Sequence, residues 1–463
     1  MNIILRKTKI TEKIIKFEKN VVIGKPRFLK YCIEQDTEKG KLILNLVTCE
    51  MVLVEKGEDA TNYLIDNYFL VSEDFDDFEF CKEFRELYRI LVNSNKKGYK
   101  HFTILTTTDC NARCFYCFEK NIKRENMDNK TANDVLDYII NNCKKNDINS
   151  ISITWFGGEP LYNLDAINTI CMGLDKAKIN YTSSVVSNGY LFTPELVKQA
   201  IDLWHIRKTQ VTLDGTREIY NLRKNYIYKN IDAYKTVINN IKLLADAKTK
   251  VIIRLNYDKN NYEDLLKLIK ELGDEFTKDQ REYISIYSHV IFNDSRPFMD
   301  EELEDLDRIQ DLLDNKAIEY SMFSKYRIPS KIYFNACAAS DLSSVVIMPN
   351  GELRSCDKIE NNTSWGSIYT NNDKCTKCIR KYGTDEMISP LEYWQETIEY
   401  DRCKDCFYYP QCIFLKHCNE YPNFDCYRIR HHYMDKIKEA MINKFHIESL
   451  KDNKIVEYNN ANH

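Results

Sequence analysis

Three cysteines close together in the sequence are the residues with the clearest potential for chemistry. Cys110, Cys114 and Cys117 follow one another at the spacing C-x3-C-x2-C. A structural zinc site closes with four ligands, and a [4Fe–4S] cluster has four irons to ligate. Three thiolates on one short segment would leave one iron open, and an open iron can chelate a substrate or a cofactor. The spacing therefore favours an iron–sulfur site over three buried structural thiols.

The residues on either side of these cysteines predict a loop between a strand and a helix. A β-branched, apolar run at 102–108 comes before them, and a helical pattern begins at Thr131. In α/β barrels, loops that follow a strand open at the C-terminal end of the sheet, where active sites are built. We therefore expect the cysteines at that end of a barrel sheet.

Strand and helix patterns alternate six times between residue 98 and about residue 320. The expected strands are 102–108, 151–155, 183–187, 209–213, 250–256 and 283–292, and the expected helices are 131–143, 164–178, 194–203, 231–247, 261–272 and 300–316. Six β/α units predict a parallel sheet with right-handed crossovers. Because six units are too few for a closed eight-stranded barrel, we expect an α/β fold with a partial (β/α)6 TIM-type barrel.

Polar motifs at the ends of later strands are candidates for ligand contacts. Gly157 and Gly158 follow the second strand, where glycine lets the backbone approach a ligand closely, and Glu159 then offers a carboxylate. Ser187 and Asn188 end the third strand, although an Asn-Gly pair is also typical of a plain turn.

An arginine after the fourth strand is a further candidate. Arg223 follows the segment Leu213-Asp-Gly, and a guanidinium can bind a carboxylate in a bidentate manner. Arg217 lies in the same segment and competes for this role. No catalytic acid or base can be assigned.

The C-terminal region is rich in cysteine. Nine of the 17 cysteines lie between 337 and 426, at positions Cys337, Cys356, Cys375, Cys378, Cys403, Cys406, Cys412, Cys418 and Cys426. Two C-x2-C pairs, 375/378 and 403/406, approach the spacing of a zinc ribbon, but this leaves five cysteines unexplained. The N-terminus does not have the pattern of a signal peptide, so metal ligation is favoured over disulfides and we expect a cytoplasmic location.

Composition excludes some classes of protein. The 463 residues carry 66 Lys and Arg against 70 Asp and Glu, a net charge of −4, which gives no general attraction to nucleic acid. No apolar run reaches the roughly 18 residues expected of a membrane span. We therefore expect neither nucleic acid nor membrane as a partner.

The first 97 residues predict a small α+β module. Strand patterns at 28–33 and 41–47 flank a polar turn, and helical patterns cover 60–67 and 80–94. Two interpretations stay open. The module could recognise a peptide that extends an edge strand of its sheet, or it could cap the bottom of the barrel.

The cysteine motif, with Tyr116 before its last cysteine, resembles the C-x3-C-x-aromatic-C signature of the radical S-adenosylmethionine (SAM) superfamily. The resemblance implies a [4Fe–4S] cluster that binds SAM through its open iron, and a 5′-deoxyadenosyl radical that takes a hydrogen atom from the substrate. It also implies SAM contacts, with the carboxylate of Glu159 on the SAM amino group, at Tyr116, Gly157, Gly158, Glu159, Ser187, Asn188 and Arg223.

The C-terminal cysteines resemble the SPASM extension of radical SAM enzymes, in the order C-x13-G-x4-C, C-x2-C-x5-C and two further cysteines. The resemblance implies two auxiliary [4Fe–4S] clusters. One would be ligated by Cys403, Cys406, Cys412 and Cys426, and the other by Cys337, Cys356 and Cys418. Cys375 and Cys378 are additional to this pattern and could supply a further ligand.

These resemblances predict four regions: the module at 1–97, a radical SAM core at 98–325, a SPASM domain at 326–435, and a helix and tail at 436–463. The implied activity is that of an oxidoreductase that oxidises or cross-links residues of a ribosomally made peptide, for instance by thioether formation. The implied partners are a precursor peptide or protein and a reductant such as flavodoxin or ferredoxin. The alternatives are a formylglycine-forming enzyme similar to anaerobic sulfatase maturases, and a non-catalytic zinc-ribbon protein.

Overall fold

The computed structural model divides the chain into two compact units. It describes all residues except 18, 95, 121, 292–297, 324–327, 333–338, 340, 358–363, 371–378, 381–386, 389–392, 394–399, 414–423 and 461–463. The N-terminal unit combines Met1–Lys96, Lys325–Ala336 and Thr397–His463, and the barrel unit combines Lys97–Ser324 and Cys337–Glu396. No helix in the described part of the chain combines the length and the apolar character needed to cross a membrane.

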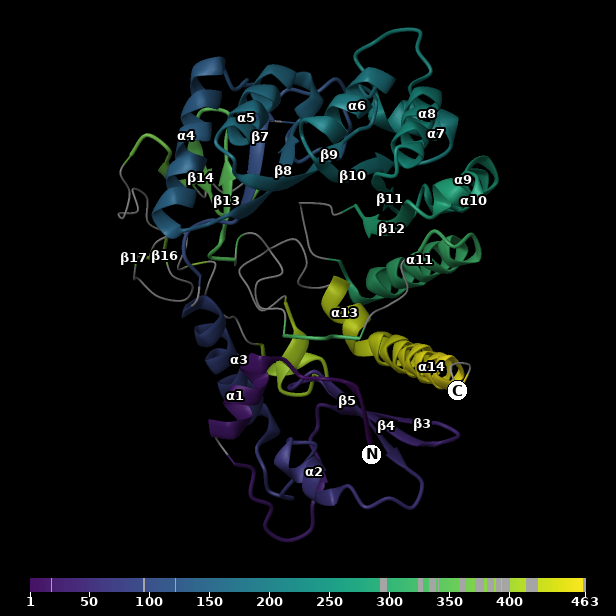
Figure 1. Ribbon diagram of the computed structural model, residues 1–463. Coiled ribbons are helices and arrows are strands. Elements are labelled where there is room, and N and C mark those ends of the chain that lie inside the picture. Colours follow the sequence, from purple (N-terminus) through teal and green to yellow (C-terminus); the bar gives the residue numbers. More distant parts are fainter. Residues whose placement is uncertain are drawn as a thin grey trace. The chain divides into compact units, whose positions relative to one another are not determined.

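The barrel unit is built on a parallel sheet whose six strands follow one another in chain order (Figure 1). They are β7 (His101–Thr107), β8 (Ser150–Gly157), β9 (Asn180–Ser187), β10 (Ile206–Leu213), β11 (Lys250–Tyr257) and β12 (Ile284–Val290). Each pairs in parallel with its neighbour. The sheet ends at β12 and does not close, so the expected partial (β/α)6 barrel is confirmed.

Helices cover one side of this sheet (Figure 1). The six expected ones are α4 (Asn129–Asn146), α5 (Leu164–Lys176), α6 (Pro194–Asp202), α8 (Ala233–Asp246), α9 (Tyr262–Glu275) and α11 (Asp300–Glu319). The structure adds three short elements that the patterns did not predict, η1 (Pro160–Tyr162), α7 (Arg217–Lys224) and α10 (Lys278–Arg281). Helix α4 begins two residues before the expected Thr131, because Asp128 accepts a hydrogen bond from the Thr131 amide at 2.7 Å.

The strands present two different faces. Along β8, Ile151, Ile153 and Trp155 are buried, whereas the alternate residues Ser152 and Thr154 are half-buried. Because side chains alternate across a strand and helices cover only one side of the sheet, the apolar residues face the helices. The polar residues therefore line the open side of the partial barrel.

A C-terminal hairpin extends the same sheet. Strand β13 (Ser344–Ile347) pairs in parallel with β7, and β14 (Glu352–Arg354) and β15 (Ser364–Ser367) follow as antiparallel neighbours. The turn between β13 and β14 contains Gly351 at φ +83°, a left-handed conformation that favours glycine. This hairpin is attached directly to β7, the strand that precedes the three cysteines. A separate small hairpin joins β16 (Ile379–Arg380) and β17 (Met387–Ile388).

The N-terminal unit holds a four-stranded antiparallel sheet in the order β1-β5-β4-β3. Its elements are β1 (Asn2–Leu5), α1 (Lys9–Phe17), β2 (Arg27–Phe28), β3 (Cys32–Asp36), β4 (Gly40–Asn45), β5 (Glu50–Glu55), α2 (Thr61–Asp66), β6 (Leu70–Val71) and α3 (Asp77–Ser94). The strand expected at 28–33 is wrong. Phe28 ends β2 and β3 begins at Cys32, because a turn separates them, in which the Cys32 amide donates to the Leu29 carbonyl oxygen at 2.9 Å.

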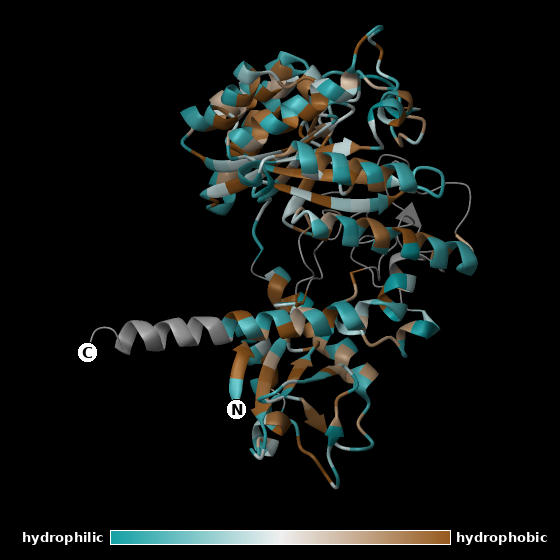
Figure 2. Ribbon diagram, turned by 90° about the vertical axis from the view of Figure 1, so that its right-hand side faces the viewer, coloured by the Kyte–Doolittle hydropathy of each residue, from teal (hydrophilic) through white to brown (hydrophobic). Residues whose placement is uncertain are grey.

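The last part of the chain packs on this N-terminal sheet. Helices α13 (Phe424–His431) and α14 (Tyr433–Asn460) end the unit, and α14 contacts β1 and β3. Ile437, Met441 and Phe445 recur every four residues and are buried in the same core as β3–β5, whose strands are coloured hydrophobic in Figure 2. Since α13 begins at Phe424, Cys426 lies inside a helix.

Candidate active site

The three cysteines lie on the loop that follows β7, and their thiols are half-buried and not in disulfides. Within the loop, the Cys117 amide donates to the Cys114 carbonyl oxygen at 3.2 Å. Burial raises the pKa of Cys110 to about 12, and the nearby charges of Glu159, Cys114 and Cys117 add to the rise. A metal that binds these sulfur atoms would displace their protons.

The end of α7 runs along this loop and holds it. The Lys224 carbonyl oxygen accepts from the Arg113 amide at 2.9 Å and lies 3.9 Å from the Cys114 sulfur. The Ile227 amide donates to the Asn111 carbonyl oxygen at 2.9 Å. The cysteine loop is thus fixed by a segment about 110 residues further along the chain.

Glu159 is fully buried beside the first cysteine. Its Oε1 accepts from the Ser187 hydroxyl at 2.8 Å, and its Oε2 accepts from the Asn188 amide at 2.8 Å. The Asn188 side chain donates to Asn111 Oδ1 at 2.6 Å and lies 3.8 Å from the Cys110 sulfur. The fold therefore brings together three residues that the sequence analysis took from two different strands.

The burial of Glu159 controls its charge. Burial raises its pKa to about 7, while hydrogen bonds from Asn188 and Ser187 act in the opposite direction. At neutral pH the carboxyl group is therefore divided between its two protonation states. A cationic ligand nearby would favour the carboxylate.

The two glycines before Glu159 are needed for close packing of backbone on backbone. A Cβ on Gly157 would lie 2.0 Å from the Thr107 carbonyl oxygen, and a Cβ on Gly158 would lie 2.3 Å from the Asp109 carbonyl oxygen. These contacts let β8 approach the cysteine loop itself. The space that a side chain would occupy at both positions is taken by this loop and by the end of β7.

A buried lysine lies beside the cysteine motif, and the sequence analysis missed it. Lys224 Nζ lies 3.0 Å from the Tyr116 hydroxyl and 3.2 Å from Asp214 Oδ2, and Tyr116 also bonds to this carboxylate. Burial is the largest single influence and lowers the pKa of Lys224. The negative charges of Asp214, Tyr116, Cys114 and Tyr220 together outweigh it and raise the pKa of the lysine. Tyr220 and Lys224 are four residues apart, so they share one face of a helix, and both are buried. This spacing is the signal in the sequence that could have identified Lys224.

The two arginines in this segment have different surroundings. Arg223 is 11% exposed, lies 4.9 Å from the ring centre of Phe115 in the cysteine loop, and pairs with Asp258 at 2.8 Å. Arg217 is 66% exposed and pairs with Asp232 at 2.7 Å. Only Arg223 of the two is therefore near the cysteines.

Several buried polar atoms around the loop have no hydrogen-bond partner among the described residues. They are Asn111 Nδ2, Glu119 Oε1 and Asp214 Oδ1. Such atoms are rare in folded proteins, because an unpaired buried polar group is costly. With three thiols as soft donors, they fit a site that holds an iron–sulfur cluster and a polar cofactor.

The described C-terminal cysteines fall in both units. In the N-terminal unit, Cys403 and Cys406 share one turn, in which the Cys406 amide donates to the Cys403 carbonyl oxygen at 3.2 Å. Burial raises the pKa of Cys406, and the charges of Cys426 and Cys403 add to the rise. Cys412 is half-buried in the same unit. In the barrel unit, Cys356 follows β14, with its sulfur 3.6 Å from Asp357 Oδ1. Cys337, Cys375, Cys378 and Cys418 lie outside the described residues.

Tyr31 lies in the same hydrophobic core as several cysteines of the N-terminal unit. Tyr31 is fully buried, and its hydroxyl has no hydrogen-bond partner in the part of the chain that the structure describes. Burial raises its pKa, and the charges of Cys81 and Cys406 add to the rise. An unpaired hydroxyl in a core that contains several thiols fits a place where sulfur acts as a hydrogen-bond acceptor.

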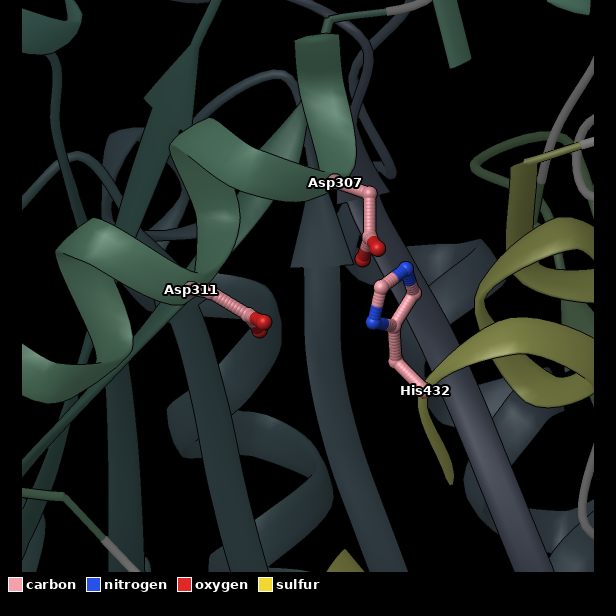
Figure 3. Close-up of side chains that lie close together, drawn as sticks. All are labelled: Asp307, Asp311 and His432. Carbon is pink, nitrogen blue, oxygen red and sulfur yellow. The ribbon is translucent and has the colours of Figure 1, made fainter. Parts of the chain in front are cut away.

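A pair of carboxylates on α11 is not part of these sites. Asp307 and Asp311 lie one turn apart and point to the same side of the helix (Figure 3). His432, which Figure 3 also labels, belongs to the N-terminal unit. Two carboxylates alone do not form a metal site, and we assign no ion to them.

Comparisons with known proteins identify the barrel unit. Residues 104–272 match the sequence profile of the radical SAM superfamily. The chain is 24% identical over 227 residues to the radical SAM cyclopropyl synthase TigE of Paramaledivibacter caminithermalis, a match that covers 45% of this chain and 46% of TigE. It is 31% identical over 134 residues to an uncharacterized protein of Methanocaldococcus jannaschii, covering 28% and 43% of the two chains. The chain thus spans less than half the length of these relatives.

Solved structures share the fold. Native anSMEcpe with bound AdoMet and a Cp18Cys peptide superposes with a TM-score of 0.54 at 16% identity, covering 75% of this chain and 99% of that chain. Native anSMEcpe with bound AdoMet alone gives a TM-score of 0.53 at 15% identity, covering 74% and 98%. The profile match contains both the cysteine loop and Glu159. The chain therefore contains a radical SAM domain, formed by residues 104–272, and is related to radical SAM enzymes.

Proposed function

We propose that this chain is a radical SAM iron–sulfur oxidoreductase that oxidises or cross-links residues of a ribosomally made peptide, for instance by thioether formation. The observation that carries the proposal is the convergence of Glu159, Ser187 and Asn188 on the three-cysteine loop. When bound, a [4Fe–4S] cluster and SAM supply a 5′-deoxyadenosyl radical that removes a hydrogen atom from the substrate.

The residues of the chain have separate tasks in this proposal. Cys110, Cys114 and Cys117 hold the cluster. Glu159 accepts a hydrogen bond from the SAM ammonium. Ser187 and Asn188 hold the carboxylate of Glu159 in place through their hydrogen bonds to it.

Four further residues contribute to the SAM site. Arg223 supplies a guanidinium for the SAM carboxylate, since it is the arginine that lies against the cysteine loop. Tyr116 of the cysteine motif contacts SAM with its ring, and Asp214 and Lys224 hold its hydroxyl in place. Gly157 and Gly158 contribute by letting the strand that carries Glu159 approach the cysteines.

The C-terminal cysteines are proposed to hold two auxiliary [4Fe–4S] clusters. Cys403, Cys406, Cys412 and Cys426 would hold one, which the turn that joins Cys403 to Cys406 supports. Cys356, with Cys337 and Cys418, would hold the other. The thiols that the structure describes at these positions are not in disulfides.

A peptide substrate is supported by two observations. One related structure contains a bound Cp18Cys peptide, and the sheet of this chain stays open beyond β12, with polar residues on its open side. The proposed partners are therefore a precursor peptide or protein and a reductant such as flavodoxin or ferredoxin, in the cytoplasm. The radical SAM domain argues against a non-catalytic zinc-ribbon protein, and no observation favours formylglycine formation.

The first test is a count of iron and sulfide per chain after anaerobic purification and reconstitution. We expect about twelve irons in the wild type and about eight in the Cys110→Ala/Cys114→Ala/Cys117→Ala variant, with loss of SAM cleavage to 5′-deoxyadenosine. The matched control is Cys143→Ala/Cys171→Ala, which removes two buried core thiols and leaves the iron unchanged. Zinc in place of iron, or SAM cleavage in the triple variant, would refute the proposal.

The peptide part of the proposal needs its own measurement. Incubation with SAM, reductant and a candidate precursor peptide should give a peptide that has lost two hydrogen atoms, detected by mass spectrometry. This product must be absent with the triple cysteine variant. SAM cleavage without a change in any supplied peptide or protein would leave the domain assignment intact and contradict the substrate class.

A further inference from the structure

The loop at residues 400–412 contains two short 3₁₀ turns, η3 (Asp401–Cys403) and η4 (Tyr409–Gln411). Cys403 ends the first turn, Cys406 lies between the two, and Cys412 directly follows the second. The Cys406 amide donates to the Cys403 carbonyl oxygen at 3.2 Å, and the Cys412 amide donates to the Tyr409 carbonyl oxygen at 3.1 Å. Turns of this kind have poor hydrogen-bond geometry and little stability of their own. Contacts from elsewhere must therefore fix the positions of the three thiols.

Arg85 on α3 provides three such contacts. Its guanidinium is buried and donates to the carbonyl oxygens of Tyr409 at 2.8 Å, Pro410 at 2.5 Å and Cys412 at 2.9 Å. One of these acceptors belongs to a cysteine. A planar guanidinium with several fixed donors can set the orientation of all three peptide groups at once, which an ammonium cannot do.

The same turn is held by further contacts with the first hundred residues. The Arg85 guanidinium lies 5.3 Å from the ring centre of Tyr409, and the ring of Phe78, on the same helix as Arg85, lies 4.7 Å from it. Gln411 is 2% exposed, and its side-chain amide donates to the Leu46 carbonyl oxygen at 2.6 Å and to the Cys49 sulfur at 3.0 Å. The segment between Cys406 and Cys412 is thus built into the core of the N-terminal unit.

We propose that Arg85 is a positioning residue for an iron–sulfur site at Cys403, Cys406 and Cys412, so that the N-terminal module is required to assemble this cluster. The inference rests on the proposed function, which places an auxiliary cluster at these cysteines. A [4Fe–4S] cluster with thiolate ligands is an anionic group, and hydrogen bonds and charges around the ligands set both its stability and its reduction potential. Arg85 is a buried cation that donates to the Cys412 carbonyl oxygen, so it affects both the stability and the reduction potential of a cluster at this loop.

The test compares Arg85→Met with Arg89→Met in the full chain after anaerobic reconstitution. Arg89 lies one turn further along α3, where its guanidinium pairs with Glu86 and is 28% exposed. We expect Arg85→Met to lose about four irons and four sulfides per chain and Arg89→Met to match the wild type. Arg85→Met must also keep the irons of the Cys110 loop and bind SAM as tightly as the wild type, which shows that the barrel unit is folded.

A conservative variant separates positioning from general packing. Arg85→Lys keeps the positive charge but cannot reach three carbonyl oxygens with one rigid group. We expect it to recover iron in part, with an altered electron paramagnetic resonance signal and a shifted reduction potential for one cluster. If Arg85→Met unfolds, the iron content, spectrum and reduction potential of Arg85→Lys alone test the inference. Wild-type iron content, spectrum and potential in Arg85→Lys would then overturn the inference.

A cysteine variant distinguishes failure of this inference from failure of the proposed function. Cys403→Ala/Cys406→Ala/Cys412→Ala should lose about four irons. If it retains all wild-type iron, no cluster is present at this loop, and both the auxiliary-cluster proposal and the role of Arg85 are refuted. If it loses iron while both Arg85 variants keep wild-type iron and potentials, only the role of Arg85 is refuted.

Discussion

The ammonium nitrogen of Lys224 lies 3.2 Å from Oδ2 of Asp214, and neither side chain is more than 4% exposed. The pair joins the last residue of α7 to the residue that follows β10, and both members contact the hydroxyl of Tyr116. Because Tyr116 belongs to the cysteine motif, this buried ion pair fixes the motif to two elements of the barrel unit. The position of the cysteine loop therefore depends on a charge pair that lies about 100 residues away in the sequence.

Lys224→Met should destabilise the protein strongly. The substitution removes the ammonium and leaves the Asp214 carboxylate buried without its cation, a change that costs about 3–5 kcal/mol. We expect the free energy of unfolding in urea to fall by about 3 kcal/mol, and the double variant Lys224→Met/Asp214→Asn to recover part of this loss. Lys198→Met, on an exposed position of α6, should stay within about 0.5 kcal/mol of the wild type. Equal stability of Lys224→Met and Lys198→Met would contradict the prediction.

SAM binding should depend on pH through Glu159. Burial raises the pKa of this carboxyl group to about 7, so it is mainly protonated below that pH and mainly ionised above it. The ionised form binds an ammonium more strongly, because its negative charge adds to the hydrogen bond. The dissociation constant for SAM should therefore be flat above about pH 8 and rise below about pH 7, by up to tenfold per pH unit.

Equilibrium dialysis of the reconstituted protein with SAM across this range measures that dependence. Glu159→Gln is the control, since its amide does not titrate. It should bind SAM more weakly than the wild type at pH 8 and show no change of affinity between pH 6 and pH 8. The same pH dependence in Glu159→Gln would assign the titration to another group.

Gly158→Ala should displace the cysteine loop. The new methyl group would lie 2.3 Å from the Asp109 carbonyl oxygen and 2.8 Å from that of Thr108, and a backbone oxygen cannot move as a flexible side chain can. Overpacking of this kind costs about 1–3 kcal/mol. We expect reconstituted Gly158→Ala to lose about four irons per chain, measured by iron and sulfide assay.

Gly24→Ala is the matched control for this substitution. No atom lies within 4 Å of the added methyl group, but φ is +82°, so backbone strain of about 1–2 kcal/mol is the expected cost. Its iron content should equal that of the wild type. Loss of iron in both variants would show that general destabilisation, rather than displacement of the loop, is the cause.

Arg223→Met should weaken SAM binding far more than Arg217→Met. A charge-assisted hydrogen bond to a carboxylate contributes about 1.5–3 kcal/mol, so the dissociation constant for SAM should rise by about 10- to 100-fold. Arg217 is mainly exposed and pairs with Asp232, and its loss should change the constant less than about twofold. Calorimetric titration with SAM measures both. Unchanged affinity in Arg223→Met would exclude it as the partner of the SAM carboxylate.

The strands and helices of the barrel unit could be predicted because each carries its own periodic pattern. In β8, Ile151, Ile153 and Trp155 alternate with Ser152 and Thr154. This alternation predicts a strand with one buried face, even when the helices and strands that pack against it are not known. The position of the cysteines between a strand and a helix followed in the same way. The convergence of Glu159, Ser187 and Asn188 could be anticipated because parallel strands end at the same edge.

Helix α7 shows where local patterns were not sufficient. It has eight residues, several of them charged, and only two buried side chains. Arg223 and Lys224 are adjacent cations, and the sequence analysis chose Arg223. Successive residues of a helix point about 100° apart, so only the rotation of α7 against β10 decides that Lys224 reaches Asp214 while Arg223 reaches Asp258.

The sequence alone determined the parallel α/β core, the three-cysteine loop at the end of its first strand and the cysteine-rich C-terminal region, because hydrophobic periodicity and cysteine spacing are local properties. Only the tertiary structure decided that residues 400–412 fold into the core of the first hundred residues. Arg85 and Tyr409 are 324 positions apart, and the arginine binds backbone carbonyl oxygens, which every residue has. A contact of that kind leaves no mark in residue types or spacing, so it exists only once the packing of the core has placed the two segments side by side.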